Sequence, residues 1–508
     1  MAAHETIFTT MTALAQRTGA VNLGQGFPDG GEPAALVDAA LSSPLPKPAR
    51  GRSLWRMVPR SLRLLTLLTG LLALTLSTAA PARTVTHRIG PIEMGGYASA
   101  YKTSFDLPHP KGRFSLRYMH ARIVDAEGRF VPQEEVMLHH VAFVNRGRVD
   151  GEKNQFYCED GDKERFYGTG EEDQSLVLPE GYGYRVRGAD RWHASWMLMN
   201  HGDRRRKVFI EYTMRYAAGW ADTPVTPFWL GVEPCKRDPI FQVPGGDEPG
   251  STFVKQVDWT PPVDGRIVAV GTHLHGGAKA MRITDPACDD RTIAESIPEY
   301  GMPDDPIYGV LPQIHEPSPR FTSYPLSATG IPIRRGHTYR LSALYDNELP
   351  HARVMGIMHA YVAPPTAQVP DCAPLPTDVE TVHWDKPFRT EIPKVDIPLA
   401  VRGPDGHARP VDTLPGPFYR PTGDAVVALR NLRFNHRKIA LSRGASILWR
   451  FDDPFLHDVT SASGPTAIGT QPLEDGAVWR QRFNRPGTYS LYCTLHPLDM
   501  QQIVEVSP

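Results

Sequence analysis

The residues best suited to chemistry lie near the C-terminus, in the string GTYSLYCTLHPLDMQQIVEV at positions 487–506. Cys493 and His496 are separated by two residues, so a sulfur and an imidazole can reach one ion from a single loop. His457 lies well upstream, in FDDPFLHDVTS, where a strand is expected to end in a loop. Copper of the electron-transfer type needs one thiolate, two imidazoles and a weak thioether. The predicted ligands of such a copper ion are therefore His457, Cys493, His496 and Met500.

The surroundings of these donors are typical of a small β-sandwich. Two strands, TYSLY and QQIVEV, are expected to flank the loop, and residues 423–508 have the length of one small domain. This segment resembles the small blue-copper proteins of the plastocyanin, pseudoazurin and amicyanin type. The resemblance implies a Greek-key cupredoxin sandwich with one type 1 copper, in which His457 and His496 bind through ring nitrogens and Cys493 through sulfur. The alternative is a sandwich of the same fold that has lost its metal.

Four further strings place histidines and methionines in strand-like surroundings. They are VMLHHVAF, WMLMNHGD, VGTHLHGGAKAMRI and ARVMGIMHAYV, which contain His139, His140, His201, His273, His275, Met355, Met358 and His359. Because side chains alternate along a strand, His273 and His275 lie on one face and can chelate one ion. His139 and His140 point to opposite faces, so they can share an ion only where the backbone bends. Imidazole suits copper or zinc, and a thioether favours copper.

The order of these strings, His-His, His-Gly-Asp, His-x-His and Met, resembles the type II ascorbate-dependent copper monooxygenases. Members of this family are peptidylglycine α-hydroxylating monooxygenase and dopamine β-monooxygenase, and the resemblance covers about residues 90–364. It implies that one copper takes His139, His140 and His201. It also implies that a second copper takes His273, His275 and a methionine within 355–358. We favour Met355 because it shares strand parity with His359, and Met358 is the alternative.

The resemblance also implies a division of chemical roles. The copper at His273, His275 and Met355 would activate dioxygen and abstract hydrogen from a small-molecule substrate. The all-histidine copper would deliver an electron across a solvent-filled cleft, and a small reductant such as ascorbate or a redox partner protein would supply it. The arginine and tyrosine arrangement that would hold a peptide carboxylate is not found, so peptide amidation does not follow.

The composition favours a chain of many short strands. There are 49 prolines and 44 glycines in 508 residues, with few long helical patterns. The formal net charge is −1, so no overall field attracts nucleic acid or an anionic membrane. The chain has five cysteines, and with Cys493 reserved for copper the other four can form up to two disulfides. Cys235 and Cys372 bracket one predicted domain and could bridge its ends.

The expected fold is mainly β, with two antiparallel β-sandwich domains followed by the cupredoxin sandwich. The predicted ranges are 84–225 and 226–364 for the two central sandwiches, 365–422 for a proline-rich linker and 423–508 for the cupredoxin domain. Residues 265–276, GRIVAVGTHLHG, and 208–216, VFIEYTMRY, show the expected strand alternation.

The N-terminus combines two unrelated patterns. Residues 57–82 have basic residues, a short apolar stretch and an Ala-Pro-Ala end, which is typical of a secretory signal. The mature protein is then expected in the periplasm or outside the cell, with no membrane segment. Upstream, residues 7–40 resemble the opening of a class I aminotransferase, without the rest of that fold. We interpret residues 1–56 as lying before the real start at Met57, and a retained extension is the alternative.

Three functions are compatible with these patterns. The first is an exported copper monooxygenase-like oxidoreductase that carries its own blue-copper electron-transfer domain. The second is a non-catalytic copper protein that passes electrons or buffers copper for a partner. The third is a β-sandwich binding module whose central copper sites have degenerated. The number of coppers per chain separates them, because the first function requires three.

Overall fold

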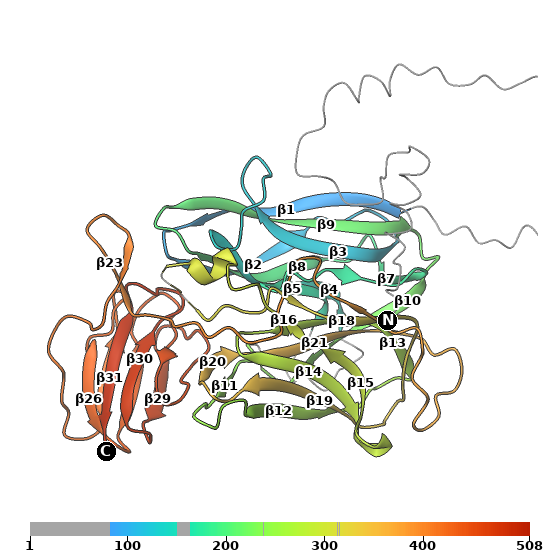
Figure 1. The fold of residues 1–508 in the computed structure, drawn as a ribbon. Helices are drawn as coiled ribbons and strands as arrows, with labels where there is room; N and C mark the ends of the chain where they lie inside the picture. Colours follow the sequence, from blue (N-terminus) through green and yellow to red (C-terminus); the bar gives the residue numbers. More distant parts are fainter. Residues whose placement is uncertain (1–81, 150–162, 237, 312, 314) are drawn as a thin grey trace, which may run out of the picture. The chain divides into compact units, whose positions relative to one another are not determined.

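The computed structural model describes residues 82–149, 163–236, 238–311, 313 and 315–508. The aminotransferase-like stretch and the predicted secretory signal, apart from Ala82, lie outside these ranges. Within them, every regular element is a β-strand or a short 3-10 helix, so the predicted mainly β fold is confirmed (Figure 1). No helix in the described part of the chain is long and apolar enough to cross a membrane.

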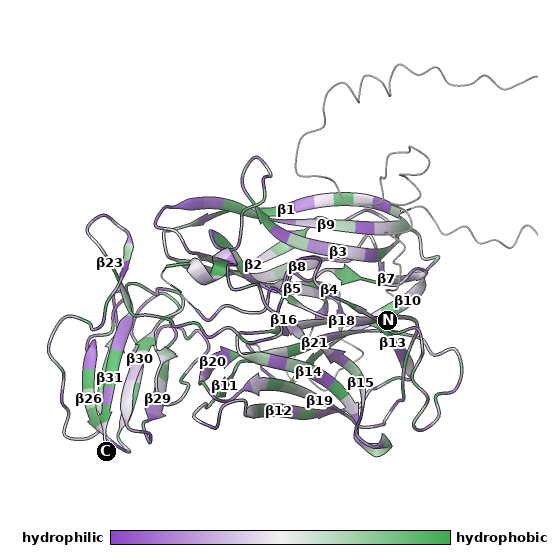
Figure 2. Cartoon of the chain, in the orientation of Figure 1, coloured by the Kyte–Doolittle hydropathy of each residue, from purple (hydrophilic) through white to green (hydrophobic). Residues whose placement is uncertain are grey.

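The first sandwich packs two layers around one hydrophobic core. One layer contains β1 (Ala82–Met94), β9 (Arg206–Ala218), β3 (Phe114–Val124) with the short β6 (Leu176–Val177), and β7 (Tyr182–Val186). The other contains β2 (Ser99–Leu107), β8 (Trp192–Asn200), β4 (Val136–Val149) and β5 (Lys163–Gly170). Along β9 every second residue from Val208 to Met214 is buried, as the alternating pattern predicts. Figure 2 shows that the strands of this layer carry both hydrophobic and hydrophilic residues.

The second sandwich has the same two-layer construction. One layer contains β10 (Thr223–Gly231), β21 (Gly356–Ala363), β13 (Gly265–Leu274), β18 (Tyr324–Ile333) and β22 (Glu380–Val382). The other contains β12 (Thr252–Trp259), β19 (Tyr339–Asp346), β14 (Ala278–Asp285) and β15 (Arg291–Ser296). Two short pairs lie beside them, β11 (Phe241–Val243) with β20 (His351–Val354) and β16 (Pro298–Glu299) with β17 (Phe321–Thr322). The core of the second sandwich contains the fully buried Trp259 and Tyr345.

Strand β10 joins the two central sandwiches into one continuous sheet. It pairs in parallel with β7 of the first sandwich and antiparallel with β21 of the second. The predicted boundary between residues 225 and 226 falls inside this strand. Backbone hydrogen bonds therefore cross from one sandwich to the other, and side chains near the junction are held by both.

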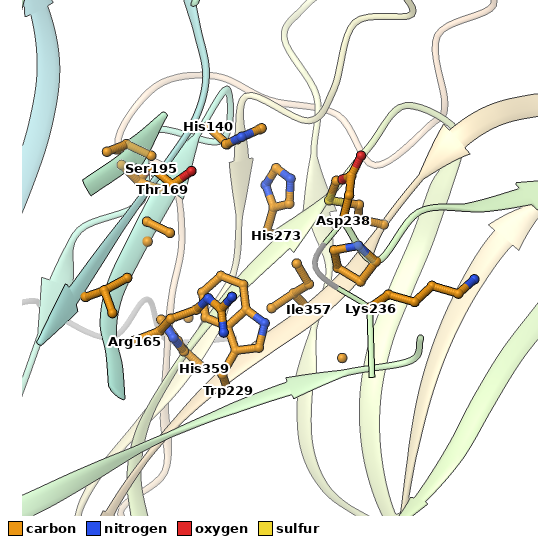
Figure 3. Close-up of a pocket in the computed structure, with 18 of the residues that line it drawn as sticks. His140, Arg165, Thr169, Ser195, Trp229, Lys236, Asp238, His273, Ile357 and His359 are labelled. Carbon is orange, nitrogen blue, oxygen red and sulfur yellow. The ribbon is translucent and has the colours of Figure 1, made fainter. Parts of the chain in front are cut away.

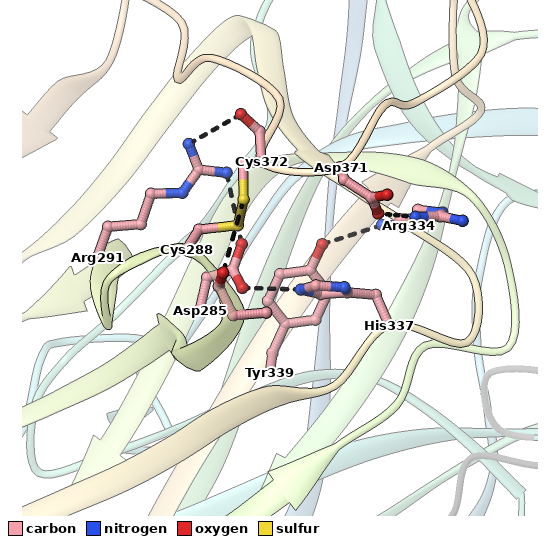
Figure 4. The surroundings of a disulfide bond; sticks show 9 residues. Asp285, Cys288, Arg291, Arg334, His337, Tyr339, Asp371 and Cys372 are labelled. Atoms are coloured by element: carbon pink, nitrogen blue, oxygen red, sulfur yellow. Dashed lines mark hydrogen bonds and ion pairs between the residues drawn. A yellow bond between two sulfur atoms is a disulfide. The ribbon is translucent and has the colours of Figure 1, made fainter.

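The segment predicted as a linker is tied to the second sandwich. Strand β22 pairs with β18, and Cys372 forms a disulfide with Cys288, which ends the 3-10 helix η3 (Pro286–Cys288) (Figure 4). The expectation that Cys372 bridges to Cys235 is therefore wrong, because the fold brings a cysteine after β14 within reach of this segment instead. The remaining strands of the segment, β23 (Ala400–Arg402) and β24 (Ala408–Pro410), pair with each other.

The C-terminal sandwich contains a three-stranded and a four-stranded sheet. The first contains β25 (Ala425–Leu429), β27 (Ser446–Phe451) and β29 (Val478–Arg482). The second contains β26 (Lys438–Ser442), β31 (Gln501–Ser507), β30 (Gly487–Tyr492) and β28 (Thr460–Ser463). The predicted strands TYSLY and QQIVEV lie within β30 and β31, which pair antiparallel and hold the ends of the intervening loop together. The core of the C-terminal sandwich includes the buried Trp449 and Phe483.

Two glycines end β13 directly after the His-x-His pair. Gly277 has a φ of +79°, a left-handed conformation that favours glycine, and a Cβ built there would overlap the ring of His351. A Cβ on Gly276 would overlap the side chain of Glu316. The string HLHGG therefore provides both two imidazoles and the room in which a neighbouring loop and β20 approach them.

We expect Gly277→Ala to lower the free energy of unfolding by about 1–3 kcal/mol, because it combines backbone strain with a side-chain overlap. Gly336→Ala is the matched control, since Gly336 also has a positive φ of 72° but a Cβ there would meet nothing within 4 Å. Thermal unfolding of the two variants measures the difference. Equal losses would show that the approach of His351 to this turn contributes nothing.

Candidate metal centres

The C-terminal donors form a compact triangle. Sγ of Cys493 lies 3.9 Å from Nδ1 of His457 and 3.8 Å from Nδ1 of His496, and the two nitrogens are 3.2 Å apart. Metal–sulfur bonds of about 2.3 Å and metal–nitrogen bonds of about 2.1 Å, set at trigonal angles, separate sulfur from nitrogen by about 3.8 Å. The observed spacing leaves room for one ion at the centre of the triangle.

The loop between β30 and β31 is closed by its own backbone. The amide of Cys493 donates to the carbonyl of Met500, and the amides of His496 and Met500 donate to the carbonyls of Cys493 and His496. Met500 is fully buried in the same core cluster as Cys493. This turn therefore keeps the three predicted loop donors on one side of the sandwich.

Two aspartates, Asp453 and Asp458, lie next to the triangle. The Asp458 amide donates to Sγ of Cys493 over 3.4 Å, and its carboxylate accepts from the amide and hydroxyl of Thr494. A carboxylate oxygen of Asp453 lies 3.3 Å from Nε2 of His457, which leaves Nδ1 directed at the triangle. The sequence feature that could have indicated the contact with Asp453 is its position four residues before His457.

The electrostatics of this site favour a bound cation. Burial, and then the neighbouring Asp458, raise the pKa of the Cys493 thiol, so the thiolate is costly without a positive partner. Burial lowers the pKa of His496 to about 4 and also lowers that of His457, although Asp453 opposes the shift at His457. Both imidazoles are therefore neutral at neutral pH, which is the form that binds a metal.

A buried ion pair connects this loop to the second sandwich. Nη1 of Arg353, on β20, lies 2.7 Å from a carboxylate oxygen of Asp458 and donates to the hydroxyl of Thr494 over 2.9 Å. The described residues accordingly group into one unit by their contacts. The loop from Cys493 to Met500, called the copper-type loop below, is thus held against β20, the strand that leads to Met355.

The histidines of the two central sandwiches meet at the junction. His139 and His140 lie on β4 at a register shift, which is the backbone irregularity that adjacent histidines need in order to share an ion. Their Nδ1 atoms are 2.9 Å apart. His273 and His275 present their Nε2 atoms to each other over 3.1 Å. The rings of His139 and His275 are 5.3 Å apart. The resemblance implied a cleft between these two sets, whereas here they are in contact.

The other predicted ligands lie nearby but in different surroundings. His201 follows β8 and is buried, and its Nδ1 has no hydrogen-bond partner among the described residues. Burial, and then the proximity of His315, lower the pKa of His201 to about 4. Met355 lines the same cavities as His140, whereas Met358 is fully buried in the core of the second sandwich.

A cavity of about 220 Å³ opens beside these imidazoles (Figure 3). His140 and His273 stand on one side of it, and Trp229, Arg165 and His359 stand on another. The ring of His359 meets Trp229 edge-on at 4.4 Å, and burial, followed by Arg165, lowers the pKa of His359 to about 3. The cavity can therefore take a small molecule with an apolar, flat part next to the histidines.

Three residues in this cluster were missed by sequence reasoning. Glu171 and Glu172 directly follow β5, whose Gly170 pairs with His140, and Nδ1 of His273 lies 3.1 Å from Glu172. His315 approaches from the second sandwich, with its Nε2 3.0 Å from Glu171. The sequence signal that could have revealed the two glutamates is their position at the end of a strand that could pair with the strand carrying His139 and His140.

Comparison with known proteins finds one limited similarity. No family model matches the chain. The chain is 26% identical over 87 residues to amicyanin-alpha of Methylorubrum extorquens, which covers 16% of this chain and 73% of that protein. A Cu(I) amicyanin with a methionine substituted is 21% identical over 16% of this chain and 82% of its own, with a TM-score of 0.16. A reduced amicyanin with a tryptophan-to-tyrosine substitution is also 21% identical, over 17% of this chain and 85% of its own, with a TM-score of 0.16.

The matched stretch of 87 residues is about as long as the C-terminal sandwich. These matches give no support to the resemblance of residues 90–364 to copper monooxygenases or of residues 7–40 to an aminotransferase. The similarity to a cupredoxin therefore applies to a part of the chain.

The ion pair between His351 and Glu316 gives a prediction about pH. Burial lowers the pKa of His351, but Glu316, 2.8 Å from its Nδ1, and Asp346 outweigh burial and raise this pKa to about 9. The pair thus stabilises the fold fully below the unfolded-state pKa of about 6.5, and this contribution disappears as pH rises through 9. We expect His351→Gln to cost roughly 2 kcal/mol at pH 6 and far less above pH 9. Denaturant unfolding at both pH values tests this, and a cost independent of pH would contradict it.

Proposed function

We propose that this chain is a copper protein whose C-terminal sandwich accepts and releases single electrons. The triangle formed by Cys493, His457 and His496 is the observation that carries the proposal, since it joins one thiolate and two imidazoles around a space for one ion. The partial similarity to amicyanin supports it. Copper bound there would supply one-electron chemistry by alternating between Cu(I) and Cu(II).

The residues around the triangle suit this role. Cys493 and His457 are fully buried, so water is kept from these two donors. Met500 would provide a weak thioether ligand, and the hydrogen bond from the amide of Asp458 would stabilise the negative charge on the sulfur of Cys493. His496 is half-buried, and the exposed Phe455 lies beside its ring at 6.4 Å. This edge offers a redox partner protein an apolar approach to a ligand.

An oxidising compartment fits the proposed function. The disulfide between Cys288 and Cys372 is of the kind that persists in the periplasm or outside the cell. Together with the signal-like residues 57–82, it supports an exported protein.

A second candidate function is oxidation of a small molecule in the central cavity. The observation that favours it is that His140, His273 and Met355 line one cavity with Trp229. His273 and His275 would hold a copper ion that supplies dioxygen chemistry, with ascorbate or a partner protein as the electron source. Glu172 would orient His273 through its Nδ1, and Trp229 would bind the apolar part of the substrate. The remaining alternative is a binding module without central metals.

We expect Cys493→Ser to abolish the strong visible absorption of the copper-loaded protein, because that band arises from the thiolate–copper bond. His496→Ala should weaken copper binding at least about tenfold. His436→Ala is the matched control, since His436 belongs to the same sandwich but stacks on Tyr419 outside the loop. Absorption spectra and copper analysis measure both effects. A visible band that survives in Cys493→Ser would overturn the proposed function.

We expect Met355→Ala to reduce ascorbate-driven oxygen consumption at least about tenfold while leaving the absorption from Cys493 unchanged, because the two donors belong to different sites. Met302→Ala serves as control, since Met302 is exposed and lies outside both cavities. Copper content per chain is measured in parallel. Unchanged oxygen consumption and copper content would remove Met355 from the site and count against the second function.

A further inference from the structure

Three donor atoms from two sandwiches converge behind the His-His pair. The donor atoms of His139, Glu171 and His315 all lie within 4.8 Å of one another. Oε1 of Glu171 is 3.0 Å from Nε2 of His315 and 4.0 Å from Nε2 of His139. Two donors that bind one ion at about 2.1 Å lie about 3 Å apart at right angles and about 4 Å apart when opposite. The observed separations fall at these two values.

A fourth donor completes the set. Sδ of Met137 lies 3.0 Å from Nε2 of His315. Met137 is two residues before His139 on β4 and is almost fully buried. The set thus contains two imidazoles, one carboxylate and one thioether, which together suit a first-row transition-metal ion.

The buried carboxylate of Glu171 lies against His315 but leaves one oxygen without a hydrogen bond. Glu171 is 3% exposed, and its Oε1 makes no hydrogen bond with the described residues, because the 3.0 Å approach of His315 does not have hydrogen-bond geometry. Its Oε2 accepts from the amide of Ser318 over 3.2 Å. A buried oxygen that accepts no hydrogen bond is costly, and a bound cation removes this cost.

The donors come from elements that different parts of the fold hold in place. His139 lies on β4 and Glu171 follows β5, and these strands pair in the first sandwich. His315 lies between the 3-10 helix η4 (Pro306–Gly309) and β17 of the second sandwich. An ion at this point therefore connects the two sandwiches by bonds that neither could make alone.

We propose that His139, Glu171 and His315, with Met137 as a thioether donor, form a metal centre that bridges the two central sandwiches. The centre takes a first-row transition-metal ion, either copper or zinc. This set differs from the one implied by the monooxygenase resemblance, in which His139 shares an ion with His140 and His201. It is independent of the copper site at Cys493.

The test uses the full chain with Cys493→Ser as the background protein, because this substitution removes the thiolate–copper site. The result therefore does not depend on whether the proposed function of that site is correct. The protein is loaded with Cu(II) or with Zn(II), dialysed, and analysed for metal per chain and for thermal unfolding. We expect His315→Ala to lose one bound ion per chain and the rise in melting temperature that this ion causes, because the ion binds only the native state. Glu171→Gln should weaken binding at least about tenfold.

His383→Ala is the matched control, since His383 is a half-exposed histidine of the second sandwich that contacts Glu299 rather than this cluster. The control should keep the metal content of the background protein. A metal content that stays the same in both His315→Ala and Glu171→Gln would overturn the proposal.

A second measurement covers the case in which His315→Ala does not fold. Anomalous diffraction from crystals of the background protein, loaded with Cu(II) or with Zn(II), should show an ion between Nε2 of His139 and Nε2 of His315. A peak with either metal supports the centre and identifies its ion. No peak between these atoms with either metal would overturn it.

Discussion

Imidazole and thiol donors that are packed together in buried surroundings impose the main energetic constraint on this chain. Burial drives the pKa of His140 to about 3 and also holds the pKa of His275 well below its ordinary value, so these imidazoles remain neutral and add no charge repulsion. Burial raises the pKa of the Cys493 thiol for the same reason. Neutral imidazoles and a thiol held within 4 Å of one another gain little from each other, but all of them gain from a shared cation. Both groups of donors therefore obey one physical rule.

Two connections in the scaffold help to keep these two groups of donors close. Strand β10 carries the sheet across the two central sandwiches, and Arg353 joins the C-terminal loop to the second of them. Breaking a buried ion pair such as Arg353 with Asp458 typically costs about 3–5 kcal/mol, because one charge is left alone. Thr494, which follows Cys493, hydrogen-bonds to Arg353, and Arg353 lies two residues before Met355. The copper-type loop and the central cavities are thus connected by one short series of contacts.

Local spacing explains which features were predictable. The predicted ligands Cys493, His496 and Met500 share one loop between two alternating strands, so the fold and the loop follow from nearby residues. The mainly β fold was predictable for the same reason, since period-2 patterns such as that of β9 are local. The pairing of Cys288 with Cys372 depends on where a long irregular segment returns to the sheet, which no local pattern reports. The continuity of β10 across both sandwiches is equally non-local.

His315 shows most clearly why the central cluster could not be predicted in full. It lies in an irregular segment without strand periodicity, and its position depends on the residues after it. The side chain of Glu316 occupies the space above Gly276 and pairs with His351, whose ring covers Gly277. The two glycines that follow His275 thus admit the segment that carries His315, and a larger residue at either position would exclude it. The role of the string HLHGG therefore depends on tertiary structure. Its two histidines provide donors, and its two glycines provide space for another donor to reach the same junction.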